Sequence, residues 1–263
     1  MVFHLLYLKQ IIEMNWSVIN ILMLFGALQG LLLVLILIFK KEKNKKARFF
    51  LALILFSLSM NLLYYFLIVA EITQTYPEIK LIYLPWSMLA SISFYLYISF
   101  ISPFQSKLST LNKAGFLPFF LFSIVLIVVN WYNYFSLSEQ QLNKELVGFL
   151  FIFEEYFGIC FTLILGFLSY KKLNRIEARL QQQFSNYNKF KLQFHKRLIL
   201  VVLLFSGVWA ISVTYSQLNN ASSLGIYFSI WLFMAFVIQW IAWTGFIKDE
   251  ALLPVLKRRE NDC

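Results

Sequence analysis

Charged residues are scarce in this sequence. They account for 14% of its 263 residues, whereas ordinary soluble domains carry about 25%. Hydrophobic residues account for 60% of the chain, and the mean hydropathy is +0.70. Because so few charges cannot cover the surface of a soluble domain of this length, the composition excludes that class and indicates an integral membrane protein.

Cysteine and histidine are also scarce. The two cysteines, Cys160 and Cys263, cannot form a disulfide framework, and with only His4 and His195 the chain has no spacing typical of a metal site. We therefore predict neither a metal nor another cofactor. The H-E-x-x-H, G-x-S-x-G and P-loop motifs are absent as well, so we do not expect an enzyme. His195 directly precedes a Lys-Arg pair, and we expect it to be solvated.

Seven apolar runs divide the chain. Such runs are typical of membrane-spanning helices, because backbone groups in lipid must be hydrogen-bonded within the segment, and none of them alternates as barrel strands do. A lead-in (1–15) without the features of a cleaved signal peptide precedes the transmembrane domain (16–247), and a tail (248–263) follows it. We predict an all-α, polytopic seven-transmembrane-helix bundle with spans at residues 16–39, 48–70, 81–101, 116–130, 147–170, 198–216 and 223–247.

Basic residues lie almost entirely on one side of this topology. Twenty of the 23 fall in the turns after the first, third and fifth runs or in the tail, and only Lys9, Lys80 and Lys144 fall on the other side. Loops rich in lysine and arginine stay in the cytoplasm. We therefore predict a multi-pass membrane protein with its N-terminus outside and its C-terminus in the cytoplasm. Contact with anionic lipid headgroups, and not direct nucleic-acid binding, explains the net charge of +10.

Small residues recur at four-residue spacing in two of the runs. Gly26 and Gly30 lie in the first, and Gly158, Thr162 and Gly166 lie in the fifth. Small side chains let helices approach closely in lipid. We interpret both stripes as helix-packing seams within the bundle, and a dimer seam is the alternative.

Polar side chains within the spans are the candidate ligand-binding residues. Glu154 and Glu155 lie in the fifth run, where a carboxylate is costly and favours a functional role, either in a ligand pocket or in a proton-sensitive switch. Gln29, Asn61 and Gln239 are further candidates, for which an interhelical hydrogen-bond network is the stronger interpretation. The membrane tryptophans are expected to face lipid or the interface, among them Trp86, Trp209, Trp231, Trp240 and Trp243.

The connector between the fifth and sixth runs, residues 171–197, follows a heptad pattern that predicts an amphipathic helix. Ser185-Asn186 is a candidate break within it. The connector either lies on the membrane surface or couples the fifth helix to a cytoplasmic output protein or to a second copy of the chain. Its apolar positions are Leu173, Ile176, Leu180, Tyr187, Phe190 and Phe194.

Three stretches together carry a family resemblance. They are residues 25–30 (FGALQG), 183–186 (QFSN) and 239–246 (QWIAWTGF). In order and placement they resemble the N-terminal membrane domain of bacterial regulators with a C-terminal AraC-type helix-turn-helix domain, over about residues 16–252. The resemblance implies a membrane sensor in the inner membrane of a bacterium. The tail of 16 residues is too short for a helix-turn-helix domain, so we expect no direct DNA binding by this chain.

Two functions from different classes follow from these observations. The first is a membrane sensor or signal-transducing module that responds to an unidentified small molecule, a lipid or a proton, and acts through another protein. The alternative is a small transporter or channel that uses the glutamates of the fifth run, although the chain shows no inverted repeat.

Overall fold

In the computed structural model of this chain, the described residues are 18–39, 44–102, 108–136, 142–183, 190–218 and 224–248. The predicted lead-in, nearly all of the tail, and Ser185-Asn186 lie outside these ranges. No described residue is in a strand, so the all-α prediction is confirmed for this part of the chain. Each of the seven predicted runs contains one long helix: α2 (Val18–Phe39), α3 (Lys45–Val69), α5 (Trp86–Phe100), α7 (Leu117–Phe135), α8 (Lys144–Gln183), α9 (Phe190–Leu218) and α10 (Leu224–Lys248).

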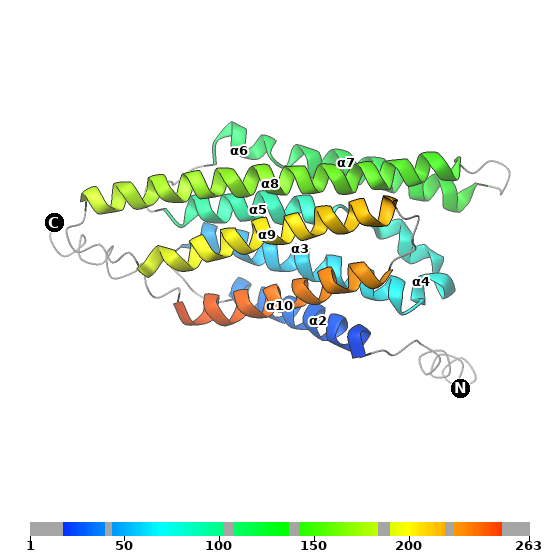
Figure 1. Cartoon of the computed structure of the whole chain (residues 1–263), viewed down its shortest axis with the longest axis horizontal. Coiled ribbons are helices and arrows are strands. Elements are labelled where there is room, and N and C mark those ends of the chain that lie inside the picture. Colours follow the sequence, from blue (N-terminus) through cyan, green and yellow to red (C-terminus); the bar gives the residue numbers. More distant parts are fainter. Residues whose placement is uncertain are drawn as a thin grey trace.

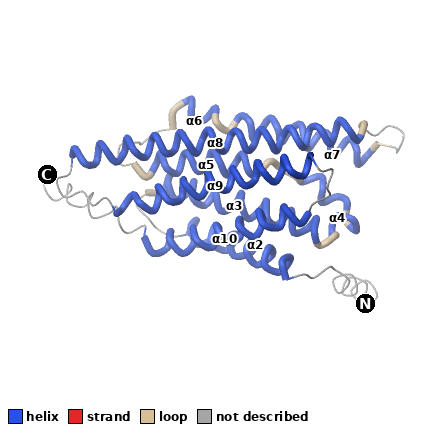
Figure 2. The backbone as a smooth tube through the Cα atoms, in the orientation of Figure 1, coloured by secondary structure: helices blue, strands red, loops and turns tan. Residues whose placement is uncertain are grey.

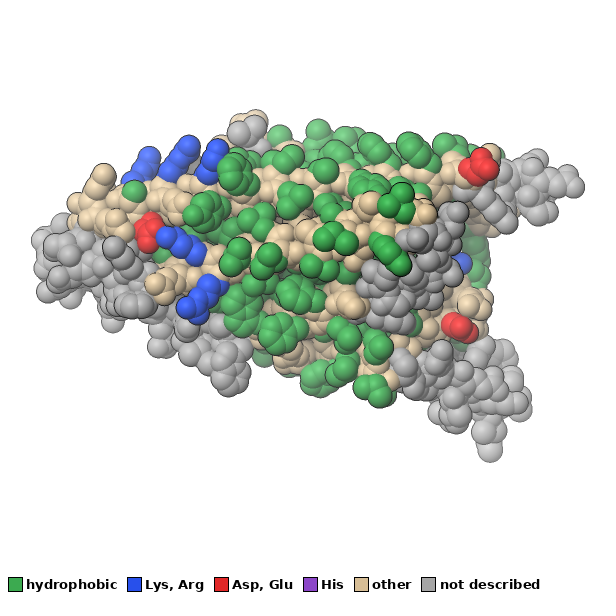
Figure 3. Space-filling view, in the orientation of Figure 1, with side chains coloured by type: hydrophobic (Ala, Val, Ile, Leu, Met, Phe, Trp, Pro, Cys, Tyr) green, Lys and Arg blue, Asp and Glu red, His purple; other side chains and the backbone are tan. Residues whose placement is uncertain are grey.

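Six segments of the described structure are helical, long and apolar enough to cross a membrane, and α10 contributes a shorter apolar stretch, Ser229–Ile241. Their exposed surface consists largely of leucine, isoleucine, valine and phenylalanine side chains. Figure 3 shows this apolar surface along the middle of the bundle, with lysine and arginine gathered at one end. Length and composition therefore agree with the predicted multi-pass membrane class.

The long helices run up and down in alternation (Figure 1). α2 packs against α3, α3 against α5, α5 against α8, and α8 against α9, while α10 returns to pack on α2 and α3. α7 lies outside this group, against α5 and the 3-10 helix η1 (Pro77–Ile82). We call the end of the bundle that carries the start of α3 and the end of α8 the basic end. The other end carries η1 and the start of α8.

The third predicted span, 81–101, lies largely within the apolar segment Pro77–Phe100, but its α-helix begins later than expected. Helix α5 starts at Trp86, because Pro85 occupies its N-cap position, and η1 together with an extended segment replaces the first turns. With 15 residues, α5 rises only about 22 Å. Nearly all of its side chains are buried, so this short helix forms the centre of the bundle. Between α3 and η1 lies α4 (Ile72–Thr75), and α6 (Thr110–Ala114) precedes α7.

Helix α8 is the longest element, with 40 residues in one uninterrupted helix. It rises about 60 Å, twice the hydrocarbon thickness of about 30 Å. Figures 1 and 2 show that its last turns continue the axis of the membrane-spanning part and do not turn along a membrane surface. The first half of the predicted connector is therefore an extension of the fifth span.

The end of α8 and the start of α9 form a hairpin at the basic end, which we call the α8–α9 hairpin. Leu173, Ile176 and Leu180 of α8 are buried, as the heptad pattern predicted. Nζ of Lys196 lies 2.6 Å from Oε2 of Glu177, and this ion pair joins the two helices. Tyr187 lies outside the described residues.

His195 is not solvated, and this prediction was wrong. Its side chain is buried, and Nε2 forms a 3.1 Å hydrogen bond with the Tyr97 hydroxyl of α5. The basic residues that follow it in sequence point to other faces of α9, since consecutive residues of a helix diverge by about 100°. His195 therefore connects the α8–α9 hairpin to the central helix.

Close helix contacts occur at the predicted glycine seams. A Cβ atom on Gly30 would lie 2.0 Å from Oγ of Ser59 in α3, and one on Gly26 would lie 2.8 Å from Cβ of Ala235 in α10. A Cβ atom on Gly166 would lie 2.7 Å from Cδ2 of Leu203 in α9. A side chain at Gly26 would meet the Cβ and backbone of Ala235, and one at Gly30 or Gly166 would require the neighbouring side chain to move, so the two stripes place α2 and α8 close to their neighbours.

Candidate functional site

A pocket lies in the interior of the bundle between α3, α5, α9 and α10, with one wall residue from α8. Its cavity volume is about 90 Å³. The wall is mostly apolar: Ile54, Leu58, Ala90, Phe94, Leu198, Val202, Phe205, Trp209, Ile230, Met234, Val237 and Ile241 contribute to it. Apolar pockets with a few placed polar groups are typical of small-molecule sites.

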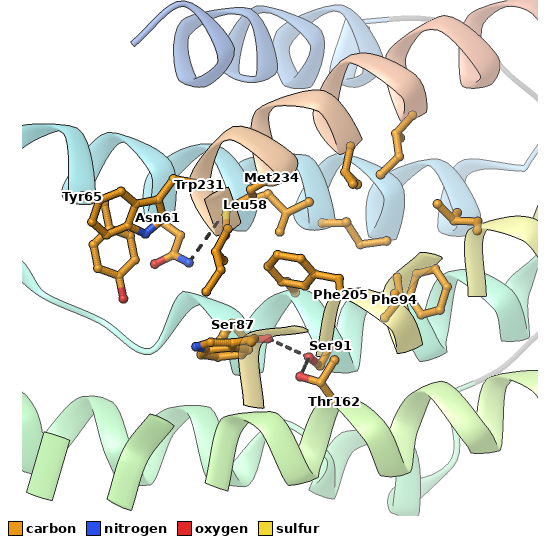
Figure 4. Close-up of a pocket in the computed structure, with 18 of the residues that line it drawn as sticks. Leu58, Asn61, Tyr65, Ser87, Ser91, Phe94, Thr162, Phe205, Trp231 and Met234 are labelled. Atoms are coloured by element: carbon orange, nitrogen blue, oxygen red, sulfur yellow. Dashed lines mark hydrogen bonds between the residues drawn. The ribbon is translucent and has the colours of Figure 1, made fainter. Parts of the chain in front are cut away.

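The wall also contains polar groups: a pair of hydroxyls, the amide of Asn61 and the hydroxyls of two tyrosines. Ser91 of α5 and Thr162 of α8 approach to 2.6 Å, and one hydroxyl donates to the other (Figure 4). The hydroxyl that accepts in this pair donates to a carbonyl of its own helix, either that of Ser87 or that of Gly158. The pair is thereby satisfied within the protein, and it fixes α8 against α5.

The side-chain amide of Asn61 has a weaker hydrogen-bond partner than these hydroxyls have. Its side-chain nitrogen lies 4.0 Å from the sulfur of Met234, across the pocket wall between α3 and α10 (Figure 4). A thioether is a weak acceptor. The amide therefore keeps hydrogen-bonding capacity that a molecule in the pocket can use.

Aromatic rings form the pocket wall toward the end opposite the basic end. The ring of Tyr65 stacks on that of Trp231, with centroids 4.8 Å apart. The ring of Tyr227 also stacks on that of Trp231, with centroids 6.0 Å apart. Tyr65 and Trp231 lie together in Figure 4, one turn from Asn61. All three aromatic residues line the pocket, so its end opposite the basic end is rich in aromatic rings and hydroxyl groups.

The two glutamates of α8 lie next to this aromatic wall. Glu154 is 2% exposed, and its Oε2 accepts a 3.1 Å hydrogen bond from the Tyr83 hydroxyl. Glu155 is half-buried, and its Oε2 lies 3.5 Å from the Tyr227 hydroxyl. Within the described residues neither carboxylate forms an ion pair. Two carboxyl groups in an apolar surrounding, with tyrosine hydroxyls as partners, give this end of the pocket a negative potential when they are ionised.

The remaining predicted polar residues lie elsewhere. Gln29 of α2 and Gln239 of α10 are hydrogen-bonded to each other, amide to amide. Neither lines the pocket. Of the predicted ligand-binding residues, only Asn61 lines the pocket. Glu154 and Glu155 lie outside the lining, and Glu155 adjoins it through the hydroxyl of Tyr227, which does line it.

The helix-packing positions of α8 border the same region. A Cβ atom on Gly158 would lie 3.2 Å from Oγ of Ser87 and 3.5 Å from the Trp209 ring. Thr162, one turn further, lines the pocket itself. The stripe of Gly158, Thr162 and Gly166 thus faces the bundle, and Glu155 lies at the same side of the helix.

Sequence reasoning missed the aromatic residues of the site. Trp231, expected to face lipid, is 3% exposed, and Trp86 is buried as well, so both predictions were wrong. A signal was present in the four-residue spacing of Asn61 to Tyr65 and of Tyr227 to Trp231, which places each pair on one helix face. Aromatic residues at such spacing also occur on lipid-facing surfaces, which is why composition alone did not separate the two.

Comparisons with known proteins do not assign the chain to a family. No protein-family model matches it, and no curated protein and no solved structure matches it either. Within the described residues no group of three or more histidine, cysteine or acidic side chains is placed to hold a metal ion. The chemistry of the site therefore rests on its own geometry.

Proposed function

We propose that this chain is a seven-helix membrane sensor whose central pocket controls the α8–α9 hairpin. In this proposal α10 is the seventh span, the basic end lies in the cytoplasm, and the other end faces the outside. The asymmetric distribution of lysine and arginine supports that orientation. The resemblance to the membrane domains of AraC-type regulators supports a sensing role, with the output carried by another protein.

One observation carries the proposal. Helix α8 is a single helix that contributes Thr162 to the pocket, and its turns beyond the membrane form the hairpin with α9. Helix α9 likewise contributes Val202 to the pocket and Lys196 to the hairpin. A molecule that separates α8 and α9 at the pocket would displace their extensions at the basic end. A ligand shifts such an equilibrium only if it binds the two arrangements with different affinity.

A matched pair of substitutions on α9 tests this coupling without a ligand. Val202→Trp fills the pocket, whereas Leu204→Trp adds the same side chain at a position 60% exposed on the outer surface. Spin labels at Gln181 of α8 and Gln193 of α9, both exposed, report the distance across the hairpin by double electron–electron resonance. We expect Val202→Trp to shift the distance distribution and Leu204→Trp to leave it unchanged.

Equal distributions in both variants would contradict the proposal. Val202→Trp also risks misfolding, so Ala90→Leu, a smaller change in the wall contributed by α5, serves as a second pocket-filling variant.

A transporter or channel is the second candidate, and Glu154 favours it. A carboxyl group that is 2% exposed within a membrane helix is typical of ion and proton pathways. Flux across proteoliposomes that is lost in both Glu154→Gln and Glu155→Gln would support that function. Unchanged leakage relative to protein-free vesicles would exclude it.

A further inference from the structure

The central pocket has two chemically different ends. Toward the basic end its wall consists of aliphatic and phenyl side chains, among them Ile54, Val237 and Ile241. Toward the other end it is lined by Tyr65, Tyr227 and Trp231. From Ile54 to Tyr65 along α3 the pocket extends about 16 Å. A molecule that fills it needs an alkyl-like body and a head group suited to aromatic faces.

The charge at the aromatic end selects among head groups. Glu155 contacts the Tyr227 hydroxyl, and Tyr227 is itself part of the wall. Glu154 lies on the adjacent face of the same helix, hydrogen-bonded to Tyr83. An anionic head group would be repelled here, and a neutral one would leave two desolvated carboxylates without a counter-charge. A cationic head group is attracted both by the carboxylates and by the faces of the stacked rings.

The arrangement of the rings fits a compact cation. Tyr65 and Tyr227 both stack on Trp231, from α3 and α10 respectively, and both present their rings to the pocket. Because the rings stack on one another, a cation would lie beside the stack, where aromatic rings in the pocket wall attract ammonium groups. Asn61, one turn below Tyr65, adds an amide with only a sulfur contact.

We propose that the pocket binds a cationic amphiphile, with an alkyl chain along the apolar wall and an ammonium head group beside the stacked rings of Tyr65, Tyr227 and Trp231, close to Glu155. This inference rests on the proposed sensor function and names the ligand class of the same pocket. The chain would lie between α9 and α10, and the head group would face the end opposite the basic end.

Three probes with the same alkyl chain test the charge requirement. Decyltrimethylammonium, decanol and decyl sulfate are titrated calorimetrically into the protein in phosphatidylcholine nanodiscs, with empty nanodiscs as the blank. We expect saturable binding of decyltrimethylammonium, about tenfold tighter than that of decanol. Decyl sulfate should show no saturable binding. Decanol or decyl sulfate binding as tightly as the ammonium compound would overturn the proposal.

Substitutions then locate the head group. Glu155→Gln should weaken decyltrimethylammonium binding about tenfold and leave decanol binding unchanged. Glu145→Gln removes the same charge from an exposed position on α8 and should leave both unchanged. Trp231→Leu should weaken binding of the ammonium compound more than that of decanol. If Glu155→Gln and Glu145→Gln behave alike, the head group does not lie at Glu155 and the proposal fails.

The hairpin measurement separates this inference from the proposed function. Charge-dependent binding without a change in the Gln181–Gln193 distance would support the ligand class and contradict the sensor. A hairpin that responds to Val202→Trp, combined with equal binding of all three probes, would keep the sensor and overturn the ligand class. Should Glu155→Gln fail to fold, the three-probe comparison on the unmodified protein still decides the ligand class.

Discussion

The Tyr83 hydroxyl donates a hydrogen bond of 3.1 Å to Oε2 of Glu154, a residue 71 positions further along the chain. Both side chains are buried. Tyr83 belongs to the extended segment before α5, and Glu154 to the half of α8 that is remote from the basic end. The contact therefore fixes the irregular segment that replaces the start of the third span, and it satisfies a carboxyl group that would otherwise be buried without a donor.

Tyr83→Phe should destabilise the bundle by about 1–2 kcal/mol, because it removes this donor and leaves the ring in place. The free energy of unfolding, or the unfolding rate, of the purified variant in mixed micelles is measured and compared with that of the unmodified chain.

Tyr134→Phe is the matched control for this change. The Tyr134 hydroxyl donates to Oε1 of Glu78 at 3.0 Å, also between two elements, but both residues are exposed. Water can replace that bond, so no resolvable change is expected. Equal losses in the two variants would show that burial of Glu154 does not determine the effect.

Gly30→Ala should destabilise the contact between α2 and α3. The added Cβ would lie 2.0 Å from Oγ of Ser59 and 3.0 Å from Cγ2 of Ile238, so the Ser59 hydroxyl must rotate and the helices must shift slightly, at a cost of about 1–3 kcal/mol. Gly207→Ala in α9 is the control, since nothing lies within 4 Å of its Cβ position. That substitution should be neutral or should stabilise by up to about 1 kcal/mol through higher helix propensity. Thermal unfolding of both variants in the same detergent measures the difference.

The sequence predicted the helices well because apolar run length and charge placement are local properties. Gly26 and Gly30 could be identified as packing positions for the same reason, since four-residue spacing alone places them on one face. The start of α5 at Trp86 has a local signal in Pro85 at its N-cap, whereas the 3-10 helix η1 before it packs against α7. Such tertiary contacts leave no periodic signal.

The candidate site was predictable only in its charged part. Glu154 and Glu155 are conspicuous in an apolar run, and Asn61 is polar in another. Whether polar residues meet depends on helix rotation, which places Gln29 against Gln239 and keeps both out of the pocket. Tyr65 and Trp231 were not recognisable for the same reason, since an aromatic ring suits a lipid-facing surface as well as a pocket wall.

The proposed orientation predicts the labelling of single cysteines along α8. In a chain carrying Cys160→Ser and Cys263→Ser, a cysteine at Glu145 should react with a membrane-impermeant maleimide added to intact cells. A cysteine at Gln181 should react only after permeabilisation. Both positions are exposed and lie about 54 Å apart on the same helix, so they report opposite sides of the membrane.

A separate chain that keeps Cys160 and carries only Cys263→Ser provides the control for this experiment. Cys160 lies on the exposed surface of α8, between the two labelled positions. Lipid should cover it, so the impermeant reagent should leave it unmodified before and after permeabilisation. Labelling of a cysteine at Gln181 in intact cells would contradict the proposed orientation and indicate the opposite one.

The hydrogen bond between Gln29 and Gln239 joins α2 to α10, and a double-mutant cycle measures its contribution. Gln29→Leu removes one partner and leaves the amide of Gln239 in an apolar surrounding, so we expect a loss of about 1–2 kcal/mol. Gln239→Leu should cost a similar amount. The double substitution should recover most of the loss, because two leucines pack without an unsatisfied amide. Additive losses in unfolding experiments would mean that each glutamine is stabilised by other contacts, and that the pair does not hold α10 to α2.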